Sequence, residues 1–268
     1  SPFKTVNPKL REEYPKLKRN MRAVAQHWRH NDGPRPTIAV IHGFMADPYW
    51  VNRMFFALPW FYQQGYDILL YTLPHHGKRA SRSSPFSGHG FFANGTAHIN
   101  ESFAHAVHDF RIFMDYLESE GVSKVGVTGI SLGGYTSALL ASVEDRLEFA
   151  IPNVPVVSLA DLVLEWFPLN LSIKAMLKIT GTSVRDIRHE LAVHSALTYQ
   201  PLLPKERLMV IAGAGDRLAP PKHARLLWDH WDRPRIHWFP GNHLVHLDKG
   251  KYLKEMAGFM RKIEFDRM

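Results

Sequence analysis

The chain has 268 residues, is 45% hydrophobic, carries a formal net charge of +8 and contains no cysteine. This length and hydrophobic content suffice for one large core, so we expect a single domain over residues 1–268. The lack of cysteine excludes disulfides, cysteine nucleophiles and thiolate metal sites. The longest uncharged stretches, such as Met54 to Tyr66, are shorter than the 18 or so apolar residues of a membrane-spanning helix.

Most of the positive charge lies in the first part of the chain. Residues 1–30 hold eight Lys and Arg against Glu12 and Glu13, so they account for +6 of the total. We treat residues 1–20 as a basic N-terminal arm. A solvated face is the simplest interpretation, and peripheral contact with an anionic membrane surface is the alternative. Nucleic acid is not an expected partner, because no nucleic-acid-binding motif accompanies the charge.

The first residues also bear on cellular location. From Ser1 onward the chain lacks the basic, apolar and small-residue succession of a signal peptide, which we expect to be absent or already removed. The location stays open, with the cytoplasm or a peripheral membrane position favoured.

After the arm, short apolar runs alternate with helical patterns, which predicts a mostly parallel central sheet flanked by helices. We expect strands over residues 21–29, 37–41, 67–72, 124–128, 149–153, 208–212 and 235–239. We expect helices over residues 50–64 (interrupted or kinked near Pro59), 100–120, 135–143 and 249–262. Residues 74–98 hold too many Gly, Pro and Ser for regular structure, so they predict a long loop near the site.

An insert of about fifty residues separates the strands that end near residue 153 and begin near residue 208. Its apolar residues include Leu162, Trp166 and Phe167, with Pro168 and Gly181 as punctuation. We therefore expect residues 156–207 to form a modest helical lid.

The most informative motif is the pentapeptide Gly129-Ile130-Ser131-Leu132-Gly133, placed between a predicted strand and a predicted helix. A sharp strand-to-helix turn strains its central residue and exposes that side chain, so its neighbours two positions away must be small. Ser131 is therefore the predicted nucleophile.

The motif, the strand order and the position in the chain together resemble the α/β-hydrolase superfamily, over residues 20–262. In that family the acid and the histidine follow the nucleophile in the chain, after later strands. The resemblance assigns the acid to Asp216, in Gly-Ala-Gly-Asp-Arg-Leu-Ala-Pro, and the base to His243, in Pro-Gly-Asn-His. His246 is a weaker alternative for the base.

The oxyanion of an acyl-transfer intermediate needs two hydrogen-bond donors, which this family takes from the backbone. The resemblance nominates the N–H of Leu132 and the N–H of Phe44, which follows a His42-Gly43 pair like the family's oxyanion loop; Met45 is the less favoured second donor. His42 itself is more consistent with a structural hydrogen-bonding role.

Sixteen histidines raise the question of a metal site. The neighbours His75 and His76, and the helical set His105, His108 and Asp109, are the best groups, but neither resembles a complete ligand set. We expect no metal and no cofactor, and we expect the stretch from His75 to Arg79 to shape the pocket wall.

Serine at the elbow argues against haloalkane dehalogenases and epoxide hydrolases, which use aspartate there. The resemblance therefore implies a serine hydrolase that cleaves carboxylic esters, of the carboxylesterase or lipase type, and the apolar lid and basic arm favour an apolar acyl ester. A thioesterase, an amidase and a carbon–carbon bond hydrolase remain alternatives. A peptidase is less favoured, because nothing marks a peptide-docking domain. A non-catalytic binding protein of the same fold is the alternative from another class.

Overall fold

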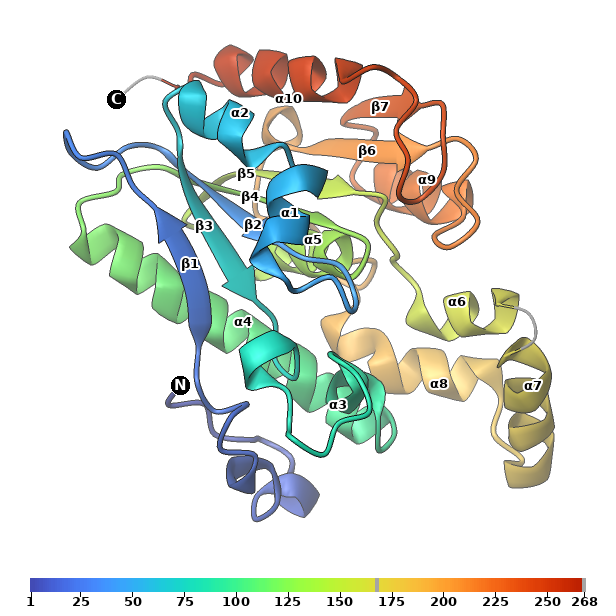
Figure 1. Cartoon of the computed structure of the whole chain (residues 1–268). Helices are drawn as coiled ribbons and strands as arrows, with labels where there is room; N and C mark the ends of the chain where they lie inside the picture. Colours follow the sequence, from blue (N-terminus) through green and yellow to red (C-terminus); the bar gives the residue numbers. More distant parts are fainter. Residues whose placement is uncertain (167–168, 267–268) are drawn as a thin grey trace.

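The computed structural model describes residues 1–166 and 169–266. Within them the strands form one seven-stranded sheet in the order β1-β3-β2-β4-β5-β6-β7 (Figure 1). The β1 strand runs antiparallel to β3, and the other neighbours are parallel. The strands are β1 Val24–Trp28, β2 Thr37–Ile41, β3 Asp67–Thr72, β4 Val125–Ile130, β5 Leu147–Asn153, β6 Met209–Gly213 and β7 Arg235–Phe239.

Helices cover both faces of the sheet. The α-helices are α1 Tyr49–Phe55, α2 Leu58–Gln63, α3 His89–Phe92, α4 Thr96–Ser119, α5 Leu132–Val143, α6 Leu159–Glu165, α7 Leu169–Thr180, α8 Val184–Leu191, α9 Pro221–His230 and α10 Lys251–Lys262. Short 3-10 helices are η1 Pro8–Leu10, η2 Tyr14–Lys16, η3 Gly77–Arg79, η4 Ala192–His194 and η5 Lys205–Arg207. One core cluster joins the sheet to α4, α5 and α9, and a second joins it to α2 and α10.

The alternation of side chains along each strand builds these two layers. In β2, Ala39 and Ile41 belong to the cluster under α4 and α5, whereas Ile38 and Val40 belong to the cluster under α2 and α10. This is the two-residue period of a strand buried on both faces. Each large apolar side chain removed from water in this way stabilises the fold by about 1.5–3 kcal/mol.

The predicted strands and the predicted helices are present. The helix expected over residues 50–64 is interrupted near Pro59, as expected, and the break lies at Phe56 and Ala57. Ala57 has a left-handed backbone (φ 47°), which ends α1. Pro59 stands in the first turn of α2, where the missing N–H costs nothing.

The expected loop over residues 74–98 is more ordered than its composition indicates. It contains η3 and α3, and α4 already begins at Thr96. The α3 helix is short, and its Phe91 is fully buried in the core cluster under α4 and α5. Tertiary burial of one aromatic ring therefore orders a segment that is rich in helix breakers.

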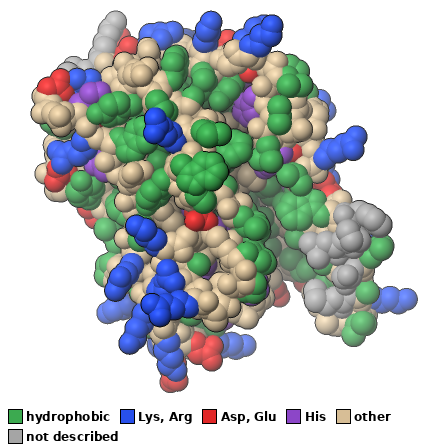
Figure 2. Space-filling view, viewed as in Figure 1, with side chains coloured by type: hydrophobic (Ala, Val, Ile, Leu, Met, Phe, Trp, Pro, Cys, Tyr) green, Lys and Arg blue, Asp and Glu red, His purple; other side chains and the backbone are tan. Residues whose placement is uncertain are grey.

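The basic arm is docked on the body of the protein. Phe3, Leu10 and Tyr14 are buried together and pack against Ala97 and Ala104 of α4. The Lys and Arg side chains of this segment point outward and gather on one part of the surface (Figure 2). The segment is therefore a structural part of the fold that presents its charges to solvent.

The insert over residues 156–207 contains α6, α7 and α8, as a helical lid requires. The α7 helix projects away from the sheet (Figure 1), with Leu171 and Ile179 strongly exposed. Phe167 and Pro168 lie outside the described residues. Among the helices of the described part of the chain, none has the length and apolar character needed to cross a membrane.

Candidate active site

Ser131 occupies the turn between β4 and α5. Its backbone has φ 57° and ψ −111°, a strained conformation for a residue with a side chain. The Ser131 N–H donates to Asn153 O of β5 (3.0 Å), and its carbonyl accepts from Tyr135 N–H (2.8 Å). These bonds hold the strained turn in place, which is the geometry of a nucleophile elbow.

The glycines of the motif are required by close packing. A Cβ on Gly133 would lie 2.0 Å from Ile41 O at the end of β2, and one on Gly129 would lie 2.4 Å from Gly133 O. A side chain at position 133 would push the elbow away from β2, and one at position 129 would collide with the backbone at the start of α5. The small residues therefore bring Ser131 close to the loop that follows β2.

Asp216 and His243 meet at the ends of the two last strands. The ring Nδ1 of His243 lies 2.7 Å from Asp216 Oδ2, and both residues are buried. The other carboxylate oxygen, Asp216 Oδ1, accepts from the N–H groups of Leu218 and Ala219 at 2.9 Å each. A carboxylate fixed by two backbone donors fixes the imidazole in turn, and it selects the tautomer that leaves Nε2 free to accept a proton.

The alternative base, His246, faces a different environment. Its ring stacks on Phe239 with the centroids 3.7 Å apart, and it packs edge-on against Tyr252. Burial lowers the pKa of His246 to about 4. The structure thus pairs Asp216 with His243, while His246 packs between aromatic rings.

The predicted oxyanion loop lies against the elbow. A Cβ on Gly43 would lie 3.7 Å from the Cβ of Ser131. Phe44 follows Gly43, and Leu132 is the first residue of α5, where backbone N–H groups have no intrahelical acceptor. Both nominated donors therefore lie next to Ser131 in the chain or in space, at the positive end of the α5 dipole.

His42 is fixed in one neutral form. Its Nδ1 lies 2.8 Å from Gly43 O, and its Nε2 accepts from Leu73 N–H at 3.0 Å. Burial lowers the pKa of His42. These contacts give His42 the structural role expected for it, because both ring nitrogens are used to hold the loop.

The structure joins the predicted residues in two pairs. Asp216 contacts His243, and Ser131 contacts the turn at Gly43. Among the described residues, no hydrogen bond joins Ser131 to His243. Catalytic hydrogen bonds are often long in a ligand-free enzyme and shorten when substrate binds.

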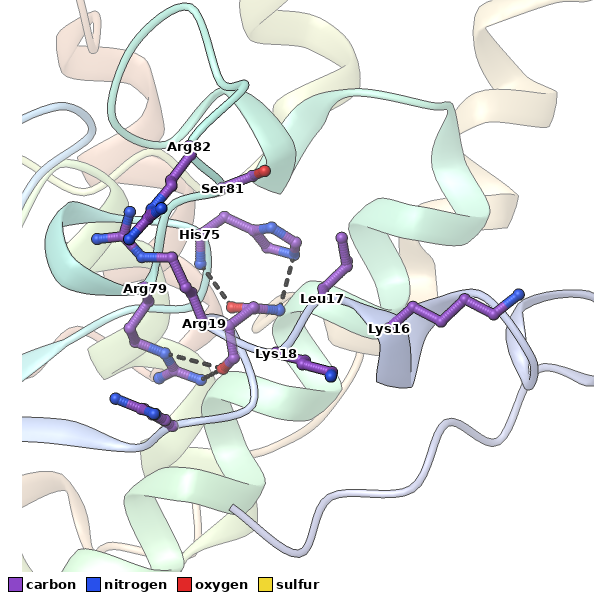
Figure 3. Close-up of a pocket in the computed structure, with 10 residues that line it drawn as sticks. Lys16, Leu17, Lys18, Arg19, His75, Arg79, Ser81 and Arg82 are labelled. Carbon is purple, nitrogen blue, oxygen red and sulfur yellow. Dashed lines mark hydrogen bonds between the residues drawn. The ribbon is translucent and has the colours of Figure 1, made fainter.

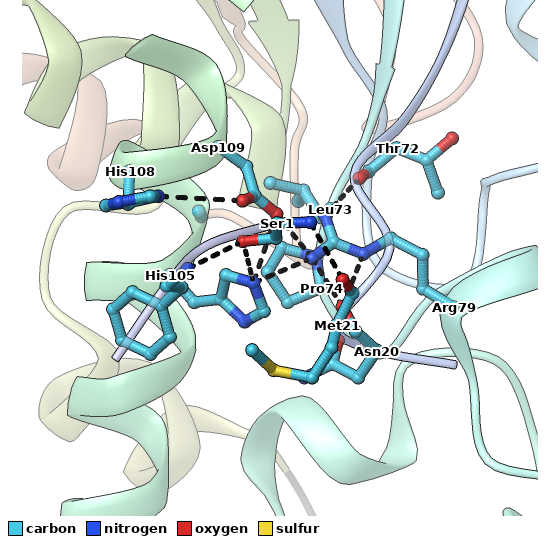
Figure 4. Close-up of polar contacts among 12 residues, drawn as sticks. Ser1, Asn20, Met21, Thr72, Leu73, Pro74, Arg79, His105, His108 and Asp109 are labelled. Atoms are coloured by element: carbon cyan, nitrogen blue, oxygen red, sulfur yellow. Dashed lines mark hydrogen bonds and ion pairs between the residues drawn. The ribbon is translucent and has the colours of Figure 1, made fainter. Parts of the chain in front are cut away.

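Of the His residues considered for a metal site, His76 packs on His42 and Phe44. His105 belongs to a different cluster, which is buried between α4, the loop after β3 and the N-terminal segment (Figure 4). Asp109 pairs with Arg79 (2.5 Å) and with His105 (3.1 Å), and all three side chains are fully buried. Burial alone would raise the pKa of Asp109, but the hydrogen bond from His105 and the charge of Arg79 lower it to about 2. Among the described residues no group of three His, Cys, Asp or Glu side chains is arranged to hold a metal.

The lid is anchored next to Asp216, the predicted acid. Trp166 at the end of α6 donates its indole N–H to Leu218 O (3.0 Å), in the same loop as Asp216. Asp161 of α6 pairs with Arg188 of α8. A cavity of about 240 Å³ lies between these lid helices and α5, and Tyr135 and Leu191 are among its lining residues.

The sequence analysis did not identify Tyr135 as a residue that lines the cavity under the lid. The residue lies one helical turn after Ser131, and its hydroxyl contacts His194 Nδ1 (2.6 Å) under the lid. Its position four residues after the nucleophile was a usable signal, because residues one turn apart share a helix face.

A family model for the prolyl oligopeptidase family matches residues 82–260, which include Ser131, Asp216 and His243. The chain belongs to the prolyl oligopeptidase family. Its α/β-hydrolase fold agrees with the resemblance drawn from the motif.

Among curated proteins, two uncharacterised Mycobacterium tuberculosis proteins, from strains H37Rv and CDC 1551, are each 33% identical over 232 residues, or 84% of this chain. The chain spans about half of the length of these relatives (53%).

Solved structures show the same fold in several hydrolases. Acetyl xylan esterase 1 of Thermoanaerobacterium sp. matches with a TM-score of 0.64 and 15% identity, over 90% of this chain and 79% of that chain. Acylaminoacyl peptidase of Pyrococcus horikoshii matches with a TM-score of 0.61 and 15% identity, over 92% of this chain and 40% of that chain. A Pyrococcus furiosus esterase matches with a TM-score of 0.60 and 14% identity, over 98% and 97%. This member of the prolyl oligopeptidase family thus shares its fold with esterases and peptidases.

Proposed function

We propose that the protein is a serine hydrolase that cleaves carboxylic esters of apolar acyl groups, with Ser131, His243 and Asp216 as its triad. The observation that carries this proposal is the 2.7 Å contact between His243 and Asp216, at the same end of the sheet as the strained turn at Ser131. A serine hydroxyl becomes a good nucleophile only when a positioned imidazole takes its proton, and a carboxylate must orient that imidazole.

The proposed reaction follows from these positions. Ser131 Oγ attacks the carbonyl carbon of the ester while His243 Nε2 accepts the hydroxyl proton. The tetrahedral oxyanion accepts hydrogen bonds from the N–H groups of Phe44 and Leu132. His243 then gives the proton to the departing alcohol, which leaves an acyl-enzyme. Water, deprotonated by the same imidazole, releases the carboxylic acid and restores Ser131.

The cavity under the lid supports an apolar acyl group. The apolar part of its wall includes Val157, Leu191, Leu197 and Leu226, together with Tyr135 one turn after Ser131, and its polar part includes Asp161, Arg188 and Ser195. Apolar walls bind an acyl chain by removing it from water. The anchoring of Trp166 on the loop of Asp216 places the lid beside the proposed acid.

Membership of the prolyl oligopeptidase family favours a second candidate, hydrolysis of a peptide or other amide bond. The same nucleophile, base and oxyanion donors would serve, because an amide passes through the same kind of tetrahedral intermediate. The likeness of the fold to an acylaminoacyl peptidase is compatible with this reaction.

A single set of assays separates the two candidates. Hydrolysis of p-nitrophenyl esters from acetate to palmitate is compared with hydrolysis of peptidyl p-nitroanilides, for the native protein and for Ser131→Ala. We expect ester turnover that rises with acyl length and disappears in Ser131→Ala. Faster turnover of the anilides would support the amide candidate. A maximum at acetate would contradict the apolar acyl preference, and activity that survives in Ser131→Ala would contradict the assignment of the nucleophile.

A further inference from the structure

A second cavity, of about 580 Å³, lies between the docked N-terminal segment and the loop that follows β3. Its volume is in the range of small-molecule sites, about 300–1,000 Å³. Figure 3 shows the two walls, with Lys16 to Arg19 on the N-terminal segment and His75 to Arg82 on the loop. None of the residues proposed for catalysis lines this cavity.

The rim of the cavity carries positive charge without a balancing negative charge. No Asp or Glu lines it, and five exposed cationic side chains do: Lys16, Lys18, Arg19, Arg22 and Arg82. In the part of the chain that the structure describes, none of these five forms an ion pair. Arg19 uses only its Nε, which donates to Lys78 O (3.2 Å), so its two terminal amino groups stay available.

The floor of the cavity is rigid and electrically balanced. The side-chain oxygen of Asn20 accepts from His75 N–H (2.8 Å), and the backbone oxygen of Asn20 accepts from Arg79 (2.8 Å). The charge of Arg79 is matched by Asp109 (2.5 Å). The fold therefore holds both walls in place without an ion pair from any of the five rim cations.

We propose that this cavity binds a ligand that carries two or more phosphate groups. One phosphate monoester brings a charge of about −1.5 to −2. This is less than half of the negative charge that would neutralise the five rim cations. Guanidinium groups bind phosphate oxygens in pairs and ammonium groups bind them as point charges, so Arg and Lys together suit this ligand. A soluble polyphosphate and the headgroups of acidic phospholipids share this chemistry.

Such a ligand would contact a residue that is adjacent in the chain to one packed on the predicted oxyanion loop. His75 lines the cavity, and the next residue, His76, packs on the rings of His42 (4.8 Å) and Phe44 (5.8 Å). The binding itself needs no hydrolytic chemistry. The Ser131→Ala protein therefore binds the ligand as the native protein does, which separates this proposal from the proposed reaction.

The test compares two variants that remove the same charge. Lys18→Ala/Arg82→Ala removes one cation from each wall of the cavity. Lys9→Ala/Arg11→Ala removes one Lys and one Arg from the same exposed segment outside the cavity. Titration calorimetry with tripolyphosphate tests a soluble ligand. Co-sedimentation with phosphatidylcholine vesicles, with and without phosphatidic acid, tests a headgroup.

We expect the native protein to bind tripolyphosphate or the vesicles with phosphatidic acid. The one that it binds identifies the source of the phosphate. The Lys18→Ala/Arg82→Ala variant should bind at least about tenfold more weakly, because it loses two charge-assisted contacts. The Lys9→Ala/Arg11→Ala variant should stay within about threefold, because neither residue lines the cavity and salt weakens the field of exposed charges. Binding to neither, or equal losses in both variants, would overturn the proposal.

Discussion

Among the described residues, two pairs of aspartate and histidine have both partners buried, and the two pairs differ in their surroundings. Asp216 and His243 stand at the ends of β6 and β7, and the carboxylate is held by backbone N–H groups. Asp109 and His105 stand one turn apart on α4, and the carboxylate is held by Arg79. The residue types and the contact distances are similar, so neither identifies function.

The two pairs differ in how the ring nitrogens of the histidine are used. The second ring nitrogen of His243 is free to take a proton beside the elbow. Both ring nitrogens of His105 are used, since Nδ1 contacts the hydroxyl of Tyr14 (3.2 Å) and Nε2 contacts Asp109. Burial lowers the pKa of His105, which keeps it neutral. We therefore propose that the pair of Asp216 and His243 serves chemistry, whereas the pair of Asp109 and His105 anchors the N-terminal segment to α4.

The largest expected effect comes from changing the two aspartates in turn. Asp216→Asn should lower kcat by about 10³–10⁴, because the amide no longer selects the tautomer of His243 or stabilises the imidazolium. Asp109→Asn should leave kcat within about threefold in the folded protein, since it contacts no reacting group. Steady-state kinetics on the best ester measures both. Similar losses in the two variants would show that the pairs do not differ in function.

For stability, in contrast to kcat, Asp109→Asn should have a large effect. Asp109→Asn leaves the buried guanidinium of Arg79 without its partner, and we expect the free energy of unfolding to fall by about 3–5 kcal/mol. Asp115→Asn is the matched control on the same helix, because Asp115 is exposed in its pair with Arg146. That control should cost less than about 1 kcal/mol. Urea unfolding measures both, and a small loss in Asp109→Asn would mean that the buried network is not an anchor.

The pH dependence of stability tests the claim that the structural histidines stay neutral. Burial lowers the pKa of His75 to about 3 and that of His194 to about 3. Because the unfolded pKa is about 6.5, the unfolded chain takes up protons below this pH that the folded chain does not, so stability falls as the pH falls.

Each of these two histidines should contribute up to about 1.4 kcal/mol per pH unit between about pH 6.5 and 4. The lowered pKa of Asp109 acts in a lower window, since its contribution is lost only as the pH falls through about 2. Urea unfolding at about pH 7.5, 6 and 5 gives the slope. Stability that is unchanged from neutral pH to about pH 5 would contradict the neutral, buried state of these rings.

The smallest expected effect separates the two candidate bases. His246→Phe should keep kcat within about twofold, because the ring already behaves as an aromatic spacer between Phe239 and Tyr252. His243→Phe should remove activity. If the two variants exchanged these results, the base would be His246.

Much of this picture follows from local sequence patterns. β3 and β7 have the predicted bounds, because each is a short apolar or alternating run between turns. The elbow follows from the spacing of Gly129, Ser131 and Gly133, and the contact between Asp216 and His243 agrees with their positions after two parallel strands.

The remainder depends on contacts between distant parts of the chain. Nothing local shows that Ala57 adopts a left-handed backbone or that Phe91 orders α3 in the core. Arg79 and Asp109 are charged residues that the sequence alone would place at the surface, yet they form a fully buried ion pair. The cavity with Lys18 on one wall and Arg82 on the other joins segments whose proximity only the fold reveals.

We propose above all that the Asp216–His243 pair activates Ser131. The most direct measurement is the rate of labelling by a fluorophosphonate, with the modified residue located by peptide mass spectrometry. We predict labelling of Ser131 in the native and Asp109→Asn proteins at similar rates, and labelling at least about a thousandfold slower in His243→Ala. A label on another residue, or an unchanged rate in His243→Ala, would contradict the claim.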